Sequence, residues 1–553
     1  MSTKKLKLGL LTDSYQIPAW AYHSLARIEN SNYAEVSLII LNHKDNLDKP
    51  QFDKDRKNGN QIIYNLFNRV DEKLFRIEPN ALQLRSLQEI VLDTPVIQVK
   101  PIQSGDFDYF ESADSDRINE YRLDILVKIG FRTLKGEILS AARNGVWTYQ
   151  LGDINRNNGN LPGFWEVVEK RPETSACLLR LGNDLGDSQV LYQSWFATYP
   201  FSPARNRNSC LWAASSFLPR QIERLHCLGE EQFNLEIKKI SPELNHDDPR
   251  PYQVPTNTLS IKLILKHLTS LVKELYQRTF YLDFWHLLIS LHEDETLEFD
   301  KFKKILPPKD RFWADPHVCQ KDGTYYVFIE EYLHKNRKGH ISVIEIDQHG
   351  NYKKPVRALE KEYHLSYPFV FEQDNHYYMV PESAQRRAIE LYECVEFPSK
   401  WQFKMNLMEN VRAVDTTLFY HLDKWWLFTA ITENQGAFPQ AELFLFYAND
   451  LFTNKWHPHP RNPIVSDMKK ARSAGRIFIR NGKIFRPSQY CSTQYGYGFS
   501  LNEIQILNET VYLERELVSV KPHWDKDLQA THTYACEGQL TVIDALKKRR
   551  KVF

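Results

Sequence analysis

The sequence predicts two folded parts, an α/β domain followed by an all-β domain built from five similar units. In the first part, short apolar runs alternate with stretches of helical spacing, which is typical of a doubly wound parallel sheet. In the second part, a tight turn followed by an aromatic or apolar strand recurs five times. Repeats of about 50 residues that consist of short antiparallel strands indicate a five-bladed β-propeller.

Composition agrees with packed domains and argues against several classes of protein. Of the 553 residues, 42% are hydrophobic and 13% are aromatic, and Lys plus Arg number 71 against 70 Asp plus Glu. No bulk charge therefore argues for nucleic acid as a partner. The seven cysteines are dispersed without metal-like spacing, the N-terminus has no signal-peptide pattern, and no apolar run has the length of an integral membrane segment. We expect a cytoplasmic protein with reduced thiols and no metal.

The α/β domain is expected over residues 1–230. Apolar runs predict strands over 6–11, 36–41, 123–129 and 145–151, and helical spacing predicts helices over 18–28 and 134–142. In sheets of this kind, ligands bind at the carboxyl ends of the strands. We therefore look there for a site in this half.

One stretch of this domain, "LDILVKIGFRTLKGEILSAARNGVWTYQLGD", resembles the Rossmann-like formyltransferase fold of methionyl-tRNA, glycinamide ribonucleotide and sugar formyltransferases. The spacing to Gly159 and Trp165 places Thr148 and Gln150 where that family has its Asn-x-His pair. The family's Asp matches Asp187. The resemblance implies a catalytic Asp187, substrate contacts from Thr148 and Gln150, and a folate or nucleotide-type donor. Because Gln cannot titrate, we expect no formyl transfer by the usual route.

A Gly-rich loop and a linker follow these positions. Asp153 and Arg156 lie in the loop and are candidates for substrate binding. The alternative is a surface loop in which the two side chains pair with each other. Residues 231–283 are expected to form a Pro-rich linker and an amphipathic helix that packs against one of the domains.

The five repeats define the second domain, residues 284–553. Their turns lie 52, 49, 58 and 56 residues apart. The last turn is close to residue 540, so we expect its unit to be completed by a strand over 285–291. The repeats begin at Asp322, Asp374, Asp423, Asn481 and Glu537.

Polar residues recur at the start of each predicted innermost strand and just after each turn strand. Because innermost strands line the axis of a propeller, we expect these side chains to converge on one mouth. The alternative is a structural network of ion pairs that holds the units together. The candidates are Asp315, Glu331, Glu382, Asp415, Arg472, Arg476, Arg486, Gln489 and His532.

Two families resemble this half. "RFWADP", "LSYPFVF", "YYMVPES", "WWLF" and "FRPSQ" resemble the propeller-like N-terminal domain of plant glucosamine inositolphosphorylceramide transferases, over roughly residues 300–545. More distantly, "ADPHV…DGTYYVFIEE" is similar to the opening blade of glycoside hydrolase family 43. This second likeness implies Asp315 as general base, Glu382 as acid and Asp415 as a residue that tunes the pKa. Arg472, Arg476 and Arg486 would then bind an anionic group, with Gln489, His532 and Glu331 as further substrate contacts.

Three functions remain open from the sequence. The first is a carbohydrate-active enzyme, a transferase or a hydrolase with transferase favoured, acting on a sugar, nucleotide-sugar or phospho-linked glycoconjugate in the propeller. The second is an N-formyl or N-acyl transferase for an amino sugar or another amine, working in the N-terminal domain. The third is a non-catalytic glycan-binding or scaffold protein.

Overall fold

The computed structural model describes residues 4–43, 59–75, 77–154, 163–240, 253–291, 298–438 and 441–551. It divides into two compact units: unit one comprises residues 1–271 with 434–438, and unit two comprises residues 272–433 with 439–553. The long helix α8 (Asn257–Phe280) contains the division at residue 271. No helix in the described part of the chain combines the length and the apolar character needed to cross a bilayer.

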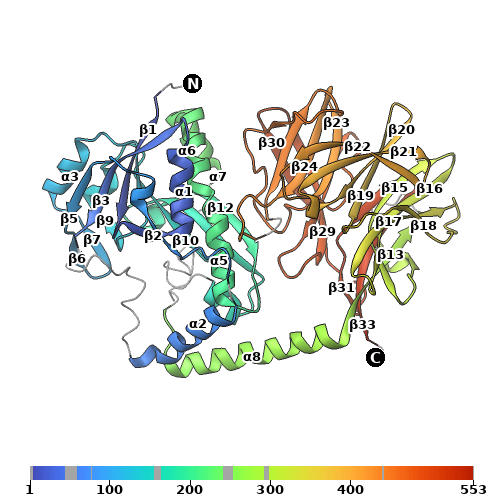
Figure 1. The fold of residues 1–553 in the computed structure, drawn as a ribbon, viewed down its shortest axis with the longest axis horizontal. Coiled ribbons are helices and arrows are strands. Elements are labelled where there is room, and N and C mark those ends of the chain that lie inside the picture. The colour runs from blue at the N-terminus through green and yellow to red at the C-terminus, as the bar shows by residue number, and fades with distance from the viewer. Residues whose placement is uncertain are drawn as a thin grey trace. The chain divides into compact units, whose positions relative to one another are not determined.

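Unit one is built on a seven-stranded sheet, which Figure 1 shows at the blue end of the chain. Five of its strands are parallel, and the last two along the chain, β11 and β12, run antiparallel at one edge. The parallel strands consist of apolar runs because both of their faces are covered. The strand order is β12 (Gln189–Ala197), β11 (Glu173–Arg180), β10 (Val146–Leu151), β8 (Ile125–Lys128), β1 (Leu6–Thr12), β3 (Ala34–Asn42) and β5 (Val96–Val99).

Helices and two smaller sheets complete unit one. Helix α1 packs with α6 and β3, while Ile118 of α3 joins a separate core cluster with Leu11 and Leu38. The helices are α1 (Ala19–Glu29), α2 (Ile62–Leu74), α3 (Ser112–Asn119), α4 (Phe164–Val168), α5 (Pro203–Ala214), α6 (Phe217–Leu228) and α7 (Glu230–Ile240). The smaller sheets pair β2 (Gln16–Pro18) with β4 (Leu84–Ser86), and β7 (Phe107–Tyr109) with β6 (Ile102–Ser104) and β9 (Thr133–Lys135).

One predicted helix of unit one is wrong. Residues 134–142 form the end of β9 and a short 3₁₀ helix, Glu137–Ser140, instead of an α-helix. Gly136 separates the two with a φ of 84°, which no right-handed helix can contain. The predicted helix over 18–28 is confirmed as α1.

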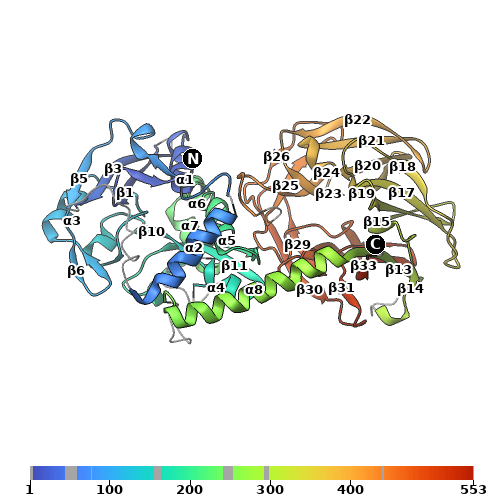
Figure 2. The same ribbon diagram turned by 60° about the horizontal axis from the view of Figure 1, so that its bottom comes forward.

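Unit two is propeller-like, because its strands form five consecutive antiparallel sheets (Figures 1 and 2). We call them sheets I to V. Sheet I contains β15 (Arg311–Lys321), β16 (Thr324–Leu333), β17 (Lys338–Ile346) and β18 (Val356–Leu359). Sheet II contains β19 (Ser366–Gln373), β20 (His376–Glu382), β21 (Ala388–Glu396) and β22 (Lys400–Glu409). Sheet III contains β23 (Ala413–His421), β24 (Lys424–Ile431), β25 (Leu443–Ala448) and β26 (His457–Pro458). Sheet IV contains β27 (Phe478–Arg480), β28 (Lys483–Tyr490), β29 (Gly498–Leu507) and β30 (Tyr512–Val520).

Sheet V joins the two ends of unit two. Its strand β13 (Tyr281–Ser290) pairs antiparallel with β33 (Leu540–Arg550) over ten residue pairs, and Figure 2 shows the two strands side by side. The expected closing strand over 285–291 therefore corresponds to the second half of β13, which begins earlier and ends at Ser290. The remaining strands of the sheet are β14 (Lys303–Ile305), β31 (Leu528–Ala530) and β32 (Tyr534–Glu537).

Candidate functional site

In each sheet, the strand that precedes the repeated turn is interrupted at the same point along the repeat. In sheets I to III the register slips between Ala314 and His317, between Ser366 and Phe369, and between Val414 and Thr417. In sheet IV the strand breaks between the Ser473 bridge and β27, and in sheet V it breaks between β31 and β32. Bulges of this kind change the direction in which side chains point and are common beside active sites.

Three residues at these interruptions adopt a left-handed backbone. The φ angle is 50° at Asp315, 41° at Tyr367 and 50° at Asp415. A positive φ costs a residue with a side chain about 1–3 kcal/mol, and such residues gather at functional sites. Three such residues at one repeated position therefore indicate a constraint other than core packing.

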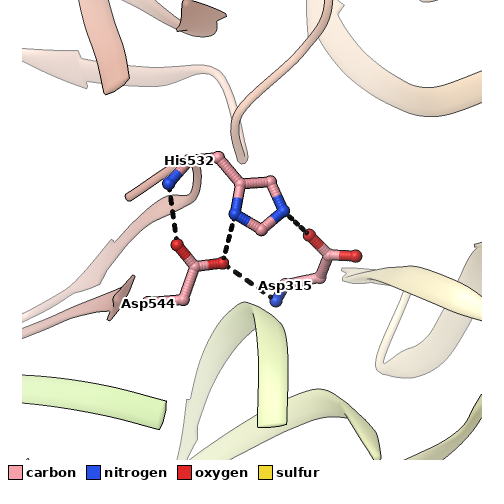
Figure 3. Close-up of side chains that lie close together, drawn as sticks. All are labelled: Asp315, His532 and Asp544. Atoms are coloured by element: carbon pink, nitrogen blue, oxygen red, sulfur yellow. Dashed lines mark hydrogen bonds and ion pairs between the residues drawn. The ribbon is translucent and has the colours of Figure 1, made fainter. Parts of the chain in front are cut away.

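The interruptions of sheets I and V meet at a buried histidine (Figure 3). His532 Nε2 lies 2.9 Å from Asp315 Oδ1, and its Nδ1 lies 2.9 Å from Asp544 Oδ2 on β33. Asp315 also accepts hydrogen bonds from Thr533 Oγ1 at 3.1 Å and from the backbone N–H of Tyr367 at 3.2 Å. The proximity of His532 and Asp315 that the repeats predict is confirmed.

The two carboxylates keep this imidazole charged. Burial alone would lower the pKa of His532, but Asp544 and Asp315 raise it well above its usual value. Burial alone would raise the pKa of Asp315, but the hydrogen bond and charge of His532, helped by Arg472, lower it to about 2. One donor atom of each of the three residues lies within 4.8 Å of the others, a spacing that could hold a metal ion. Such a cation would have to displace the imidazolium that now bridges the carboxylates.

A second ion pair lies beside the first. Arg472 donates to both oxygens of the fully buried Asp415, and Gln489 Nε2 donates to Asp415 Oδ2 at 3.0 Å. Arg472 also lies 3.4 Å from Glu382 Oε2, and its guanidinium lies over the half-exposed Tyr495 ring, 4.8 Å from the centroid. The side chain of Glu382 is 12% exposed, so this carboxyl is a polar group through which the cluster reaches solvent.

Two further carboxyl groups complete what we call the inner-strand cluster. Burial raises the pKa of Glu330 well above its usual value, and the nearby carboxylates of Asp315 and Glu382 raise it further. Burial, together with Asp415, likewise raises the pKa of Glu382, although Arg472 opposes this. Three aspartates face only two cations here, so protonation of both glutamates is the arrangement that charge balance favours. The cluster comprises Asp315, Glu330, Glu382, Asp415, Arg472, Gln489, His532 and Asp544.

Three predicted site residues lie elsewhere. Glu331 points to the other face of β16 and accepts from Arg311, Trp313, His340 and Ser342 inside sheet I, because neighbouring side chains of a strand alternate. Arg486 forms a two-pronged pair with Glu514 of β30 at 2.8 Å. Arg476 pairs with Glu537 at 3.2 Å and donates to the backbone oxygen of Val370. These corrections leave Arg472 as the arginine of the cluster.

Asp544 is the cluster residue that the sequence interpretation missed. It lies in the run "LTVIDAL", where a single acidic residue interrupts an otherwise apolar strand. Buried charges are rare unless they are paired, so this isolated Asp was a usable signal. Glu330 is the second correction, since the neighbouring Glu331 was assigned to the site in its place.

The candidates of unit one do not form one site. Gln150 pairs in register with Cys177 of β11, whereas β11 ends at Arg180, which pairs with Trp147. The turn that follows β11 therefore lies beyond the amino end of β10, and this turn carries the exposed Asp187. Asp187 is thus away from Gln150 and from Thr148, whose hydroxyl contacts the backbone oxygen of Lys128 at 3.5 Å. Asp153 pairs with Arg171 at 3.5 Å. Arg156 lies outside the described residues.

Comparison with known proteins gives unit two a sequence likeness. Residues 305–540 match the family described as "Glucosamine inositolphosphorylceramide transferase 1, N-terminal". The chain is 34% identical over 206 residues to glucosamine inositolphosphorylceramide transferase 1 of Oryza sativa subsp. japonica, and 31% identical over 209 residues to that of Arabidopsis thaliana. Each alignment covers 37% of this chain and 27% of the relative. The chain therefore matches about a quarter of the length of these relatives.

Solved structures give weaker likenesses. Bombyx mori GH32 beta-fructofuranosidase matches with a TM-score of 0.32 and 12% identity, covering 43% of this chain and 60% of that one. A thermostable family-43 glycoside hydrolase matches at 0.31 and 10%, with 41% and 83% covered. Glycinamide ribonucleotide transformylase 1 from Symbiobacterium toebii matches at 0.26 and 13%, with 40% and 88% covered. These scores are too low to establish a shared fold.

Proposed function

We propose that the inner-strand cluster is the active site of a carbohydrate-active enzyme acting on a sugar, nucleotide-sugar or phospho-linked glycoconjugate. The observation that carries this proposal is the contrast between Glu382, whose pKa is raised, and Asp315, whose pKa is lowered to about 2. Environments that separate the pKa values of neighbouring carboxyl groups provide an acid and an ionised partner at one pH. Glycosyl chemistry needs such a pair across the scissile bond.

Each group would have a separate role. Glu382, the more accessible of the two protonated glutamates, would donate its proton to the leaving oxygen. Asp315 would act through Oδ2, which accepts the backbone N–H of Tyr367, because Oδ1 already accepts from both His532 and Thr533. His532 and Asp544 would hold that carboxylate in place. Arg472 would keep Asp415 paired and place its positive charge beside an anionic part of the substrate.

Transfer is favoured over hydrolysis because the sequence relatives are named as transferases. With this function we propose a five-bladed propeller for unit two and a formyltransferase-type fold for unit one. The second candidate, formyl or acyl transfer in unit one, is not favoured by the geometry, since Asp187 and Gln150 lie toward opposite ends of β10.

Substitution of Glu382 tests the active-site assignment. Glu382→Gln keeps the shape and removes the acid, so we expect turnover to fall by about 10²–10⁴-fold with little change in melting temperature. Activity is measured as nitrophenol release from a panel of p-nitrophenyl glycosides and as nucleoside diphosphate release from nucleotide-sugars.

Glu331→Gln is the matched control, because it removes a buried glutamate of the same half that lies outside the cluster. It should lower the melting temperature while the folded fraction keeps its turnover. Full turnover in Glu382→Gln would refute the assignment and favour a structural or glycan-binding role for the cluster.

A further inference from the structure

A cavity lies on the outer strands of sheet II and shares no residue with the inner-strand cluster. Its volume is about 410 Å³, and it is lined by β21, β22, Arg386 just before β21 and the segment that precedes β19. Cavities of roughly 300–1,000 Å³ are the usual size for small-ligand sites. We call it the sheet II pocket.

A buried carboxylate forms the floor of this pocket. Glu390 is 4% exposed and accepts hydrogen bonds from the hydroxyls of Tyr363 at 2.7 Å and Tyr392 at 3.0 Å, both on Oε2. Burial raises the pKa of Tyr363 to about 12, so this phenol stays a donor at neutral pH. Both phenols therefore donate to Oε2. The other oxygen, Glu390 Oε1, lies 3.6 Å from Arg386 Nε, which is farther than either phenol lies from Oε2.

The backbone is irregular where these side chains lie. The register of β21 against β22 slips between Ile389 and Glu390 and again between Leu391 and Tyr392. Two bulges within four residues are unusual in a hairpin, and bulges re-aim side chains next to binding sites. They bring Glu390 opposite Asn406 and Tyr392 opposite Phe403.

The pocket offers an exposed aromatic ring and an unused acceptor. Phe403 is 49% exposed, whereas the Tyr392 ring, which it meets edge to face at 5.9 Å, is buried. Asn406 donates from Nδ2 to Glu409 at 2.7 Å, whereas its buried Oδ1 has no hydrogen-bond partner among the described residues. A buried acceptor without a donor is costly, so it fits a hydroxyl of a ligand.

The charges of the lining cancel. Lys361 and Arg386 are opposed by Glu362 and Glu390, and both cations already lie over rings: Lys361 Nζ is 5.0 Å from the Tyr392 centroid and the Arg386 guanidinium carbon 5.7 Å from that of Tyr363. An anion would have to compete with the Glu390 carboxylate. A neutral molecule with an apolar face and several hydroxyls matches all of these groups.

We propose that the sheet II pocket binds an uncharged saccharide, with a sugar face against the Phe403 ring and hydroxyls on Asn406 and Glu390. This site is independent of the inner-strand cluster and would hold a glycan whether or not that cluster is catalytic.

Saccharide binding by the full chain tests the proposal. Maltose, cellobiose, mannobiose and N-acetylchitobiose are titrated by saturation-transfer NMR, with cellobiouronic acid as the anionic comparison. We expect millimolar binding of at least one neutral disaccharide and a loss of about tenfold or more in Phe403→Ala and in Asn406→Ala. Tyr420→Ala removes another half-exposed aromatic ring, on β23, and should leave binding unchanged.

Two results would overturn the proposal: no binding of any neutral disaccharide, or binding that Phe403→Ala and Asn406→Ala leave intact. Tighter binding of the uronic acid would show that the ligand is anionic, which also contradicts it. Glu382→Gln should keep full saccharide binding, so failure of the active-site proposal and failure of this one give different results.

Discussion

Glu330 and Glu331 are adjacent on β16 and have opposite electrostatic surroundings. Glu330 faces Asp315 and Glu382, and its pKa is raised by burial and by those carboxylates. Glu331 is also buried, but hydrogen bonds from His340, Arg311, Ser342 and Trp313 lower its pKa. The two side chains therefore respond to pH in opposite directions.

We predict opposite effects of the two amide substitutions on stability. A raised pKa in the folded state means that the contribution of Glu330 is fully present below the unfolded value near 4.3 and is lost as pH rises through the folded value. Glu330→Gln should therefore be more stable than the unmodified protein at pH 8, on the order of 1 kcal/mol, and should show little difference at pH 4. Urea unfolding at the two pH values measures this.

Glu331→Gln should lose about 3 kcal/mol at pH 8, because the amide cannot replace a charge that accepts four hydrogen bonds. Its contribution is present above the unfolded pKa and disappears as pH falls through the lowered folded value. Equal losses in the two variants at pH 8 would contradict the assignment of Glu330 as a protonated acid.

Predictions for single residues succeeded where a residue has a fixed position in the repeat. They failed where strand register decides which face of the sheet a side chain lies on. Asp315, Asp415 and His532 occupy equivalent positions before the turns of their repeats, so the repeat spacing alone located them. Glu330 and Glu331 differ by one position, and one position reverses the face of a strand. Arg486 has its partner, Glu514, two strands away in sheet IV, and the spacing of the repeats carries no information on such a pairing, so this ion pair could not be foreseen.

At the scale of the element, the feature that builds the inner-strand cluster is the interruption of the strand before each repeated turn. At this interruption Asp315, Tyr367 and Asp415 adopt left-handed backbone conformations. Sheet IV has Gly475 at the equivalent position, with a φ of 146°. A Cβ on Gly475 would lie 2.0 Å from the backbone oxygen of Tyr534. This interruption therefore admits only glycine, whereas its counterparts tolerate side chains.

Gly475→Ala should cost more than about 3 kcal/mol, because strain and a backbone clash combine. Gly482→Ala is the matched control: its φ is 73°, but nothing lies within 4 Å of an added Cβ, so we expect a loss of only about 1 kcal/mol. Thermal unfolding compares them. Similar melting temperatures for the two variants would show that sheet IV adjusts to the clash.

Elements with strong periodicity could be predicted, and elements set by tertiary contacts could not. Four of the five parallel strands of unit one follow from apolar runs, while β5 was not predicted. The turn strands of sheets I to V follow from the repeated turn, which is Asp-Gly in sheet I and Asn-Gly in sheet IV. The segment over 134–142 has helical spacing, yet β9 pairs with β7 through Thr133–Lys135 and removes its first turn. Bulges such as those in β21 leave no pattern in a single sequence.

At the scale of the whole molecule, unit two is closed by the pairing of β13 with β33. Ten residue pairs join Tyr281–Ser290 to Thr541–Arg550, and the core of sheet V includes Leu287, Ile289 and Val542. Because β13 and β33 pair with each other, neither strand has an exposed edge where they meet. The stability of all five sheets therefore depends on a strand at each end of the unit.

Truncation after Gln539 removes β33, and we expect unit two to lose cooperative unfolding and to aggregate, because β13 and β32 both lose their partner. Truncation after Arg550 removes only residues beyond that strand and should unfold like the full chain. Differential scanning calorimetry and light scattering compare the two. A cooperative transition that survives loss of β33 would mean that sheet V contributes little.

The β13–β33 pairing also imposes an order on synthesis. Some 250 residues separate Ser290 from Leu540, so at roughly 5–20 residues per second the ribosome needs between about 12 and 50 s to make the partner of β13. During that interval sheets I to IV are made, while β13 has only the three-residue strand β14 as a neighbour, paired through Leu287, Leu288 and Ile289. The growing chain thus carries an apolar strand with one open edge through nearly half of its own translation, which makes this segment the natural place for a chaperone to bind.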